Sequence, residues 1–281
     1  MKDLLKVKRG ITHAGRFHTD DVLSTVLLLE LNPNIEIERV SEYIADDTNE
    51  EELVYDIGLG EFDHHEEERE LDEFGYPYSA FGKLWREFGR SYLERYGFQN
   101  IEAAFDKFNR FYVSKVNQGD NIGYKNVFKF YENDLIIRFN PSWMEKKEKL
   151  DISNKQFFKA VEFAKMLFEN WMRVLYEQIE LSDLELSIWE RAVQNGKDGI
   201  VVLEEKIPWQ IFIKKEGYED VKLIIDKSDR GGYSITSKDK DLYQIKDSKH
   251  LIFVHPSKFM GVAETLDKAI IGAKYSLNLA C

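Results

Sequence analysis

Two short apolar segments near the start of the chain each lead into histidine and aspartate residues. The segment 7–12 runs into His13, and the segment 53–57 is followed by the pair His64 and His65. Short apolar runs bounded by polar residues are typical of buried strands. Adjacent histidines on a strand point to opposite sides and, taken alone, are equally well explained as solvated. Because the chain has only 6 histidines, two such clusters at two strand ends favour one shared site instead.

An amphipathic helix is predicted between these two segments. Asp20 and Asp21 precede apolar residues at helical spacing. A carboxylate at that place also favours a helix N-terminus, so one of the two is explained equally well as a cap. The alternating segment 35–40 predicts a further strand. A strand, helix, strand, strand order is typical of an α/β sheet, in which sites gather beyond the carboxyl ends of the strands, and we expect His13 and Asp56 at such ends.

The rest of the chain changes character at Gly196. Before it, the apolar spacing predicts helices at residues 78–96, 101–113 and 154–195, and the Gly, Asn and Asp content of 117–123 predicts a tight loop. Beyond it, strands are predicted at 199–203, 209–213, 221–225, 233–236 and 251–254, with a last helix from residue 261 or 263 to 276. We therefore predict two domains: an α/β domain with a parallel sheet and a helical linker, residues 1–190, and a smaller α+β domain, residues 191–281.

Charge and composition limit the partners that we expect. The chain has 39 Lys and Arg against 51 Asp and Glu, a net charge of −12, which argues against non-specific binding of long nucleic acid but not against a short anionic substrate. No segment approaches about 18 uninterrupted apolar residues, so we expect no membrane span. The single cysteine, Cys281, cannot form an internal disulfide, and we expect a cytoplasmic protein.

The candidate metal ligands are more numerous than one ion needs. They are His13, His18, Asp20, Asp56, His64 and Asp120. Two divalent ions bridged by one carboxylate would use them all, and Asp56, between the clusters, is the expected bridge. Imidazole and carboxylate together suit Mn²⁺, Co²⁺, Fe²⁺ or Zn²⁺ better than Ca²⁺, and Mg²⁺ could also act. For Asp120, in a glycine-containing segment, a turn-forming role is the alternative.

A pair of metal ions favours phosphoryl chemistry, because it stabilises the attacking and leaving oxygens together. His65 could orient the substrate or protonate the leaving oxygen. Cations for the phosphate oxygens could be Arg16 in the first domain and, in the second, Lys227, Arg230 or Lys258. Two glycines follow Arg230 and would let backbone amides approach an anion, although a hairpin turn with a solvated arginine explains them equally well.

Taken together, these motifs resemble those of the DHH phosphoesterase superfamily, named for the sequence Asp63-His64-His65, and most of all the melanocyte proliferating gene family. The matching segments, in order, are 12–21, 54–58, 62–65, 139–143 and 253–261. The resemblance implies a parallel-sheet DHH-type domain with two metals, joined by a helix to a smaller domain that closes over the substrate. The last segment adds His255 to the expected substrate-binding residues.

The resemblance also implies a division of the ligands between two metals. The first metal would be held by His13, His18 and Asp56, and the second by Asp20, Asp56, His64 and Asp120. His65 would face the scissile phosphate. Many superfamily members have aspartate where His18 stands, and the family's Asp-Asn-Gly pattern can be aligned with residues 117–119 or 120–121. We adopt Asp120 as the ligand.

The leading functional hypothesis is a two-metal-dependent phosphodiesterase, a 3′–5′ exonuclease on RNA or short oligonucleotides, with Mn²⁺ as the expected metal. Within the same superfamily, an inorganic pyrophosphatase or a small-nucleotide phosphatase is the enzymatic alternative. A non-catalytic metal- or nucleotide-binding regulatory protein is the alternative from another class. The oligomeric state is left open, with a homodimer among the options.

Overall fold

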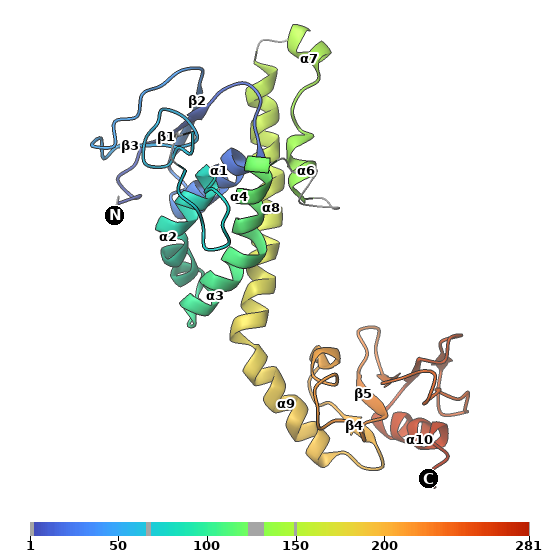
Figure 1. Ribbon diagram of the computed structural model, residues 1–281. Coiled ribbons are helices and arrows are strands. Elements are labelled where there is room, and N and C mark those ends of the chain that lie inside the picture. Colours follow the sequence, from blue (N-terminus) through green and yellow to red (C-terminus); the bar gives the residue numbers. More distant parts are fainter. Residues whose placement is uncertain (1–2, 66–68, 123–131, 149–150, 281) are drawn as a thin grey trace. The chain divides into compact units, whose positions relative to one another are not determined.

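The computed structural model describes residues 3–65, 69–122, 132–148 and 151–280, which Figure 1 shows as a coloured ribbon. The chain divides into two compact units, residues 1–180 and 181–281. The sequence predicted a boundary after residue 190. The division falls after Glu180 because Trp189, on the following helix, is fully buried in the core of the second unit, beside Val201 and Leu203.

A three-stranded parallel sheet organises the first unit. Its strands are β1 (Arg9–His13), β2 (Glu36–Val40) and β3 (Glu52–Val54), in the order β2-β1-β3. Arg9 of the central strand pairs with Glu36 on one side and with Glu52 on the other. This confirms the α/β class and the parallel sheet, whereas the DHH-type arrangement of the unit stays an expectation.

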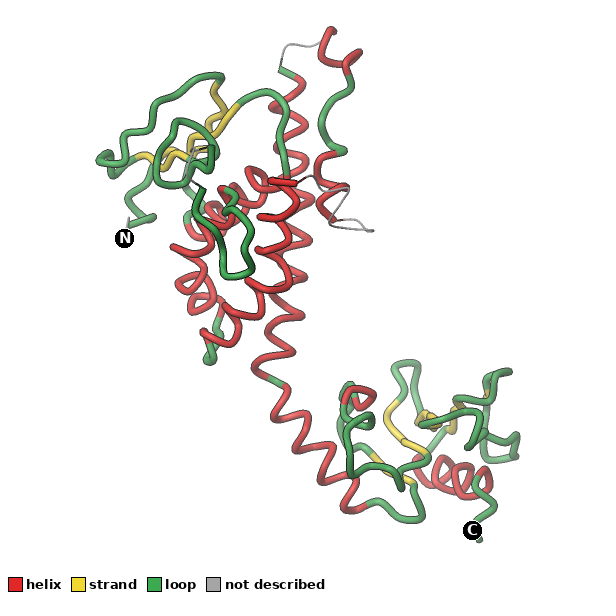
Figure 2. The backbone as a smooth tube through the Cα atoms, in the orientation of Figure 1, coloured by secondary structure: helices red, strands yellow, loops and turns green. Residues whose placement is uncertain are grey.

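Helices make up most of the first unit, as the tube in Figure 2 shows. They are α1 (Thr19–Leu31), α2 (Ala80–Tyr96), α3 (Ile101–Phe108), the π-helix η1 (Asn109–Val113), α4 (Ser114–Ile122), α6 (Glu132–Ile137), α7 (Trp143–Glu148) and α8 (Ile152–Glu180). Helix α1 packs against α2, α4 and α8, and it is buried on nearly every face. Polar residues such as Asp20, Asp21 and Thr25 are buried together with its apolar residues, so α1 belongs to the core. Its first turn is therefore held rigidly next to the sheet.

The predicted tight loop at 117–123 is wrong, since Asn117–Ile122 continue helix α4. The side chain of Asn117 is buried, where its Oδ1 accepts hydrogen bonds from the amide (3.0 Å) and hydroxyl (2.8 Å) of Ser79. Its Nδ2 donates to Asp72 Oδ2 at 3.0 Å. Because these partners satisfy the amide inside the protein, the asparagine has no need of the turn that it favours elsewhere. Residue 123 lies outside the described residues.

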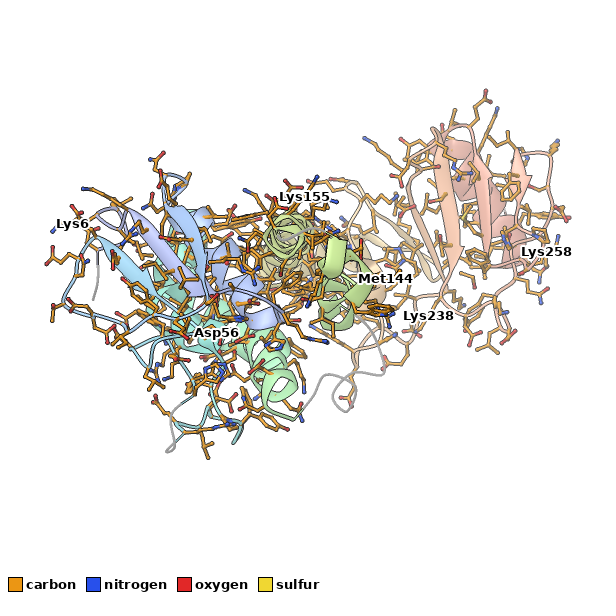
Figure 3. The ribbon with its side chains drawn as sticks, turned by 90° about the horizontal axis from the view of Figure 1, so that it is seen from above. Lys6, Asp56, Met144, Lys155, Lys238 and Lys258 are labelled. Atoms are coloured by element: carbon orange, nitrogen blue, oxygen red, sulfur yellow. The ribbon has the colours of Figure 1, made fainter. Side chains whose placement is uncertain are left out.

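The second unit contains a mixed sheet between helices. Its elements are α9 (Ser182–Asn195), β4 (Ile200–Val202), the 3₁₀ helix η2 (Trp209–Ile211), β5 (Leu223–Lys227), β6 (Tyr233–Ser237), β7 (Phe253–Val254), β8 (Met260–Ala263) and α10 (Leu266–Ser276). The strand order is β4-β5-β6-β8-β7, and only the β4/β5 pair is parallel. Figure 3 shows the side chains of both units and labels Lys258 in this one.

Two predictions for the second unit are wrong. The segment expected as a strand at 209–213 forms η2, because Pro208 precedes it and Trp209 turns into the core. Met260–Ala263, where the last helix was expected to begin, is strand β8 and pairs with β6 and β7. Helix α10 starts only after Thr265, whose side chain accepts a hydrogen bond from the amide of Lys268 (3.3 Å). No helix among the described residues is long and apolar enough to span a bilayer.

Candidate metal centre

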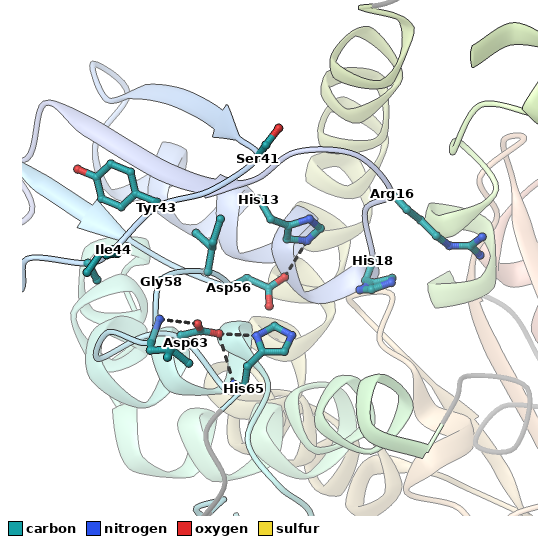
Figure 4. Close-up of a pocket in the computed structure, with 13 residues that line it drawn as sticks. His13, Arg16, His18, Ser41, Tyr43, Ile44, Asp56, Gly58, Asp63 and His65 are labelled. Carbon is teal, nitrogen blue, oxygen red and sulfur yellow. Dashed lines mark hydrogen bonds and ion pairs between the residues drawn. The ribbon is translucent and has the colours of Figure 1, made fainter. Parts of the chain in front are cut away.

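The carboxyl ends of the parallel strands bring the predicted ligands together. His13 is the last residue of β1, and Asp56 follows the end of β3. Because these two strands are neighbours and run in parallel, their ends meet at the same edge of the sheet. Asp20 lies in the first turn of α1, which begins at this edge, and Asp120 reaches it from α4. Figure 4 shows the resulting pocket.

Asp56 joins the two histidine clusters. Its Oδ1 lies 2.9 Å from His64 Nε2, and its Oδ2 lies 3.1 Å from His13 Nε2. The side chain is buried, and the residue has a φ of 55°, which is uncommon for a residue other than glycine but is tolerated best by Asp and Asn. Each oxygen of one carboxylate thus faces a different imidazole.

Asp20 and Asp120 complete the centre around His64. The Nε2 atom of His64 is 3.6 Å from Asp20 Oδ2 and 3.5 Å from Asp120 Oδ2. His18, which is more exposed, lies near the edge, with its Nδ1 3.9 Å from Asp120 Oδ1. All six predicted ligands therefore lie close together. Their role as ligands stays a prediction, but a turn-forming role for Asp120 does not fit its position in a helix.

Asp21 also belongs to the centre, although it was not among the predicted ligands. Its Oδ2 is 3.2 Å from His13 Nε2, while its Oδ1 accepts a hydrogen bond of 2.9 Å from the amide of His18. The residue therefore caps helix α1 with one oxygen and faces the candidate ligands with the other. The adjacent pair Asp20-Asp21 was the signal in the sequence, but the pattern cannot show where the second carboxylate points.

The centre concentrates negative charge in a buried place. Burial, together with the nearby carboxylates of Asp56 and Asp120, raises the pKa of Asp20 well above its usual value. In the part of the chain that the structure describes, neither oxygen of Asp20 has a hydrogen-bond partner. Leaving such a group buried and unsatisfied is costly. Bound cations would remove this cost.

The pKa values of His13 and Asp56 are both shifted against the effect of burial, because hydrogen bonds outweigh it. Burial by itself would lower the pKa of His13, but hydrogen bonds to Asp21 and Asp56 outweigh it and raise the pKa to about 10. Burial would raise the pKa of Asp56, and hydrogen bonds from His13 and His64 outweigh it and hold the pKa below its usual value. Asp56 is thus an ionised carboxylate at neutral pH, the form that binds a metal.

The donor atoms fall into three groups that fit divalent ions. The groups are His13, Asp21 and Asp56; Asp56, His64 and His65; and His18, Asp20 and Asp120, with the ligand atoms within 4.8 Å of one another in each. Asp56 belongs to two of them. Imidazole nitrogens with carboxylate oxygens suit Mn²⁺, Fe²⁺, Co²⁺ or Zn²⁺, so the residues present fit the metals that the sequence implied.

His65 is held differently from His64. Its Nδ1 is 2.6 Å from Asp63 Oδ1, and this hydrogen bond raises the pKa of His65. Asp63 is itself buried, and it also accepts hydrogen bonds from the amides of Leu59 and His64, both at 2.8 Å. Asp63 therefore orients the histidine pair, while the ring of His65 lines the pocket and remains accessible.

Asn140 fixes the loop between His13 and α1, a role that the sequence did not reveal. Its Nδ2 donates to the carbonyl of Phe17 (2.7 Å), and its Oδ1 accepts from the amide of the same residue (3.0 Å). Arg39 holds the other end of the loop by donating to the carbonyls of His13 (3.1 Å) and Gly15 (3.2 Å). These contacts set the positions of residues on either side of Phe17.

Asn140→Ala is expected to weaken metal binding roughly tenfold, because losses of this kind beyond the direct ligands typically cost ten- to a hundredfold in affinity. The helix content should stay unchanged, since Asn140 lies between α6 and α7. Calorimetric titration with metal measures the affinity, and circular dichroism measures the helix content. Asn170→Ala, on the exposed side of α8, is the matched control. Metal affinity equal to that of wild type would show that the loop needs no such clamp.

The centre opens into a pocket of about 830 Å³. It is lined by His13, Arg16, His18, Ser41, Tyr43, Ile44, Ala45, Asp56, Ile57, Gly58, Leu59, Asp63 and His65. Arg16, predicted to bind phosphate, thus lines the pocket. Arg230, His255 and Lys258 belong to the second unit, and their contact with a substrate stays a prediction.

The chain matches proteins of one family along most of its length. The model of a family labelled MYG1_exonuc and described as "Uncharacterised protein family (UPF0160)" matches residues 10–237. The MYG1 protein of Schizosaccharomyces pombe is 24% identical over 99% of both chains. The MYG1 proteins of Dictyostelium discoideum (23% identical over 95% of both chains) and Saccharomyces cerevisiae (22% over 96% of both) are also similar. No solved structure matches the chain significantly.

Proposed function

Because the chain belongs to the MYG1 family, we propose that it is a metal-dependent phosphodiesterase that removes nucleotides from the 3′ end of RNA or of short oligonucleotides. The family model's name refers to exonuclease activity, and the site offers donor atoms for metals. The net charge of −12 favours short substrates, since long nucleic acid is held through many basic contacts.

The observation that carries this proposal is the placement of Asp56. Its two oxygens face His13 and His64 at 3.1 and 2.9 Å, and it belongs to two of the three candidate ligand groups. A carboxylate so placed can serve two cations at once. A pair of divalent ions, with Mn²⁺ the proposed metal, would activate water and stabilise the attacking and leaving oxygens of a displacement at phosphorus.

The residues around Asp56 divide into two ligand sets. We assign His13, Asp21 and Asp56 to one ion, and Asp20, Asp56, His64 and Asp120 to the other. His18 lies beside Asp120 at the edge of the second set. Asp21 takes the place first expected for His18, because it is Asp21 that faces His13 Nε2, at 3.2 Å.

Two further residues act on the substrate. Arg16 lines the pocket and would bind a phosphate oxygen through its fixed positive charge. His65, whose Nδ1 is engaged by Asp63, presents its Nε2 for hydrogen bonding to the leaving oxygen. Because that contact with Asp63 raises the pKa of His65, the ring is better supplied with a proton to donate.

His65→Ala is therefore expected to lower kcat by roughly a hundredfold to ten-thousandfold, the usual contribution of a general acid or base, while leaving the metal content nearly intact. Steady-state kinetics together with elemental analysis of the same preparations measures both quantities. His250→Ala removes an imidazole from the second unit and should change neither. Loss of metal in His65→Ala would place His65 among the ligands instead.

The proposed function is tested with a short RNA carrying a label at its 5′ end. Stepwise shortening in the presence of Mn²⁺ by wild type, and none by Asp56→Asn, supports a 3′–5′ exonuclease. Intact RNA with release of orthophosphate from pyrophosphate would support the pyrophosphatase alternative. Bound metal without turnover of either substrate, or of mononucleotides and cyclic dinucleotides, would contradict a hydrolase and favour a regulatory protein.

A further inference from the structure

The pocket at the metal centre has a second wall that the chemistry proposed above does not use. This apolar wall consists of Tyr43, Ile44, Ala45, Ile57 and Leu59. In Figure 4, Tyr43 and Ile44 lie on one side of Asp56, whereas His18 and Arg16 lie on the other. One pocket thus combines a place for phosphate with a place for an uncharged group.

The apolar wall is exposed to an unusual degree. Ile44 and Leu59 are 89% and 70% exposed. Apolar side chains gathered beside a polar site, rather than scattered singly, often mark a ligand-binding surface. Leu59 also has a φ of 56°, a conformation that is unfavourable for a leucine and that recurs at ligand-binding sites.

The apolar wall is held in place before any ligand arrives. The hydroxyl of Tyr43 donates to Glu52 Oε2 at 2.6 Å, and the same carboxylate accepts a hydrogen bond from Arg9. The amide of Leu59 donates to Asp63 Oδ2 at 2.8 Å. Ordering these groups in advance lowers the entropy that binding must overcome. Since Asp63 also holds His65, the wall and the candidate proton donor share one support.

We propose that the apolar wall is a subsite for a nucleobase, whose planar face packs on Tyr43, Ile44 and Leu59 while its phosphate lies at the metal centre. This inference rests on the proposed function and specifies its substrate. Aromatic side chains bind bases through their π-faces with little regard to sequence. The pocket volume of about 830 Å³ is within the range of small-ligand sites. Pyrophosphate has no group that could use this wall.

Binding provides the first test, and it requires no turnover. The Mn²⁺-loaded protein is titrated with adenosine 5′-monophosphate and with ribose 5-phosphate, which differ by the base alone. We expect wild type to bind the nucleotide about tenfold more tightly, a modest value for stacking of one base. The double variant Ile44→Ser, Leu59→Gly keeps Tyr43 but removes the other two side chains that the base packs on, so it should lose most of this preference and bind ribose 5-phosphate as wild type does.

The variants are chosen so that folding does not obscure the result. Glycine adopts a positive φ without strain, so Leu59→Gly relaxes the backbone, and Ile44 has little burial to lose. Leu5→Ser removes a leucine that is 78% exposed outside the pocket and is the matched control. Equal binding of both ligands by wild type, or equal weakening of both in the double variant, would overturn the proposal.

A hydrolysis experiment tests the nucleobase subsite and the exonuclease activity as two distinct claims. Two short RNAs are compared, one ending in adenosine and the other in an abasic residue at the 3′ end. The double variant should lose severalfold in kcat/KM on the first and little on the second. If wild type cleaves neither RNA, the proposed exonuclease activity is contradicted. The binding preference for adenosine 5′-monophosphate over ribose 5-phosphate would still show whether the nucleobase subsite exists.

Discussion

Asp56→Asn is expected to lower phosphodiester hydrolysis on the order of a thousandfold and to remove metal from both positions at once. An amide keeps the size of the side chain but carries no charge, and its nitrogen must face either His13 or His64, which now lie 3.1 and 2.9 Å from the two oxygens. The fold should survive, because Asn tolerates the φ of 55° at this position as well as Asp does.

Elemental analysis and RNA hydrolysis on the same preparation measure this prediction. Asp226→Asn is the matched control, since Asp226 is also a buried aspartate, bonded to Ser234 in the second unit. Two fully occupied ions and unchanged turnover in Asp56→Asn would show that this carboxylate bridges nothing. Loss of one ion alone would assign Asp56 to a single ligand set.

The second large effect concerns stability rather than turnover. Asp20→Asn is expected to make the metal-free protein more stable by about 1–3 kcal/mol, because it removes a carboxylate whose ionised form is disfavoured by burial and by the nearby carboxylates of Asp56 and Asp120. The same variant should gain stability from Mn²⁺ only at the site of His13, Asp21 and Asp56, because Asp20 is assigned to the other ion. Wild type, in contrast, should gain about 2.7 kcal/mol for each site when the free ion is at a hundred times its Kd.

Denaturant unfolding in EDTA and in Mn²⁺ measures the free energy of unfolding of the variant and of wild type without and with metal. Asp72→Asn provides the contrast, since Asp72 is buried but accepts hydrogen bonds from the amides of Phe74 and Tyr76 (both 2.9 Å) and from Asn117 (3.0 Å). The Asp72→Asn substitution should destabilise the protein both in EDTA and in Mn²⁺. An Asp20→Asn variant that is less stable than wild type in EDTA would mean that Asp20 contributes favourably without metal.

The residues at strand ends could be predicted from the sequence, because their positions follow from a general rule. His13 and Asp56 terminate apolar runs, and neighbouring parallel strands must bring such ends together. The role of Asp21 could not be predicted from the sequence. One of its oxygens caps α1 and the other faces His13, and only the structure shows that a single carboxylate does both. The place of Tyr43 and Ile44 in the pocket could not be predicted, because they lie in an irregular segment between β2 and β3 that has no apolar periodicity.

The errors have a common physical origin in tertiary contacts. Asn117 is typical of turns, yet its buried amide is satisfied by Ser79 and Asp72, and the helix continues. Trp209 fits an alternating strand pattern, yet the proline before it and the burial of its ring produce a 3₁₀ turn. Partners remote in sequence outweighed the local pattern at Asn117, whereas at Trp209 an adjacent proline acted together with burial.

The anchored side chain of Asn117 has a consequence for aligning relatives of this chain. Asp120 lies on the same helix three positions later, so the contacts of Asn117 with Ser79 and Asp72 also fix the rotation of Asp120 about the helix axis. One inserted or deleted residue between them would turn the carboxylate by about 100° away from His64. An ungapped interval from Asn117 to Asp120 is therefore a geometric criterion for choosing between competing alignments of this region.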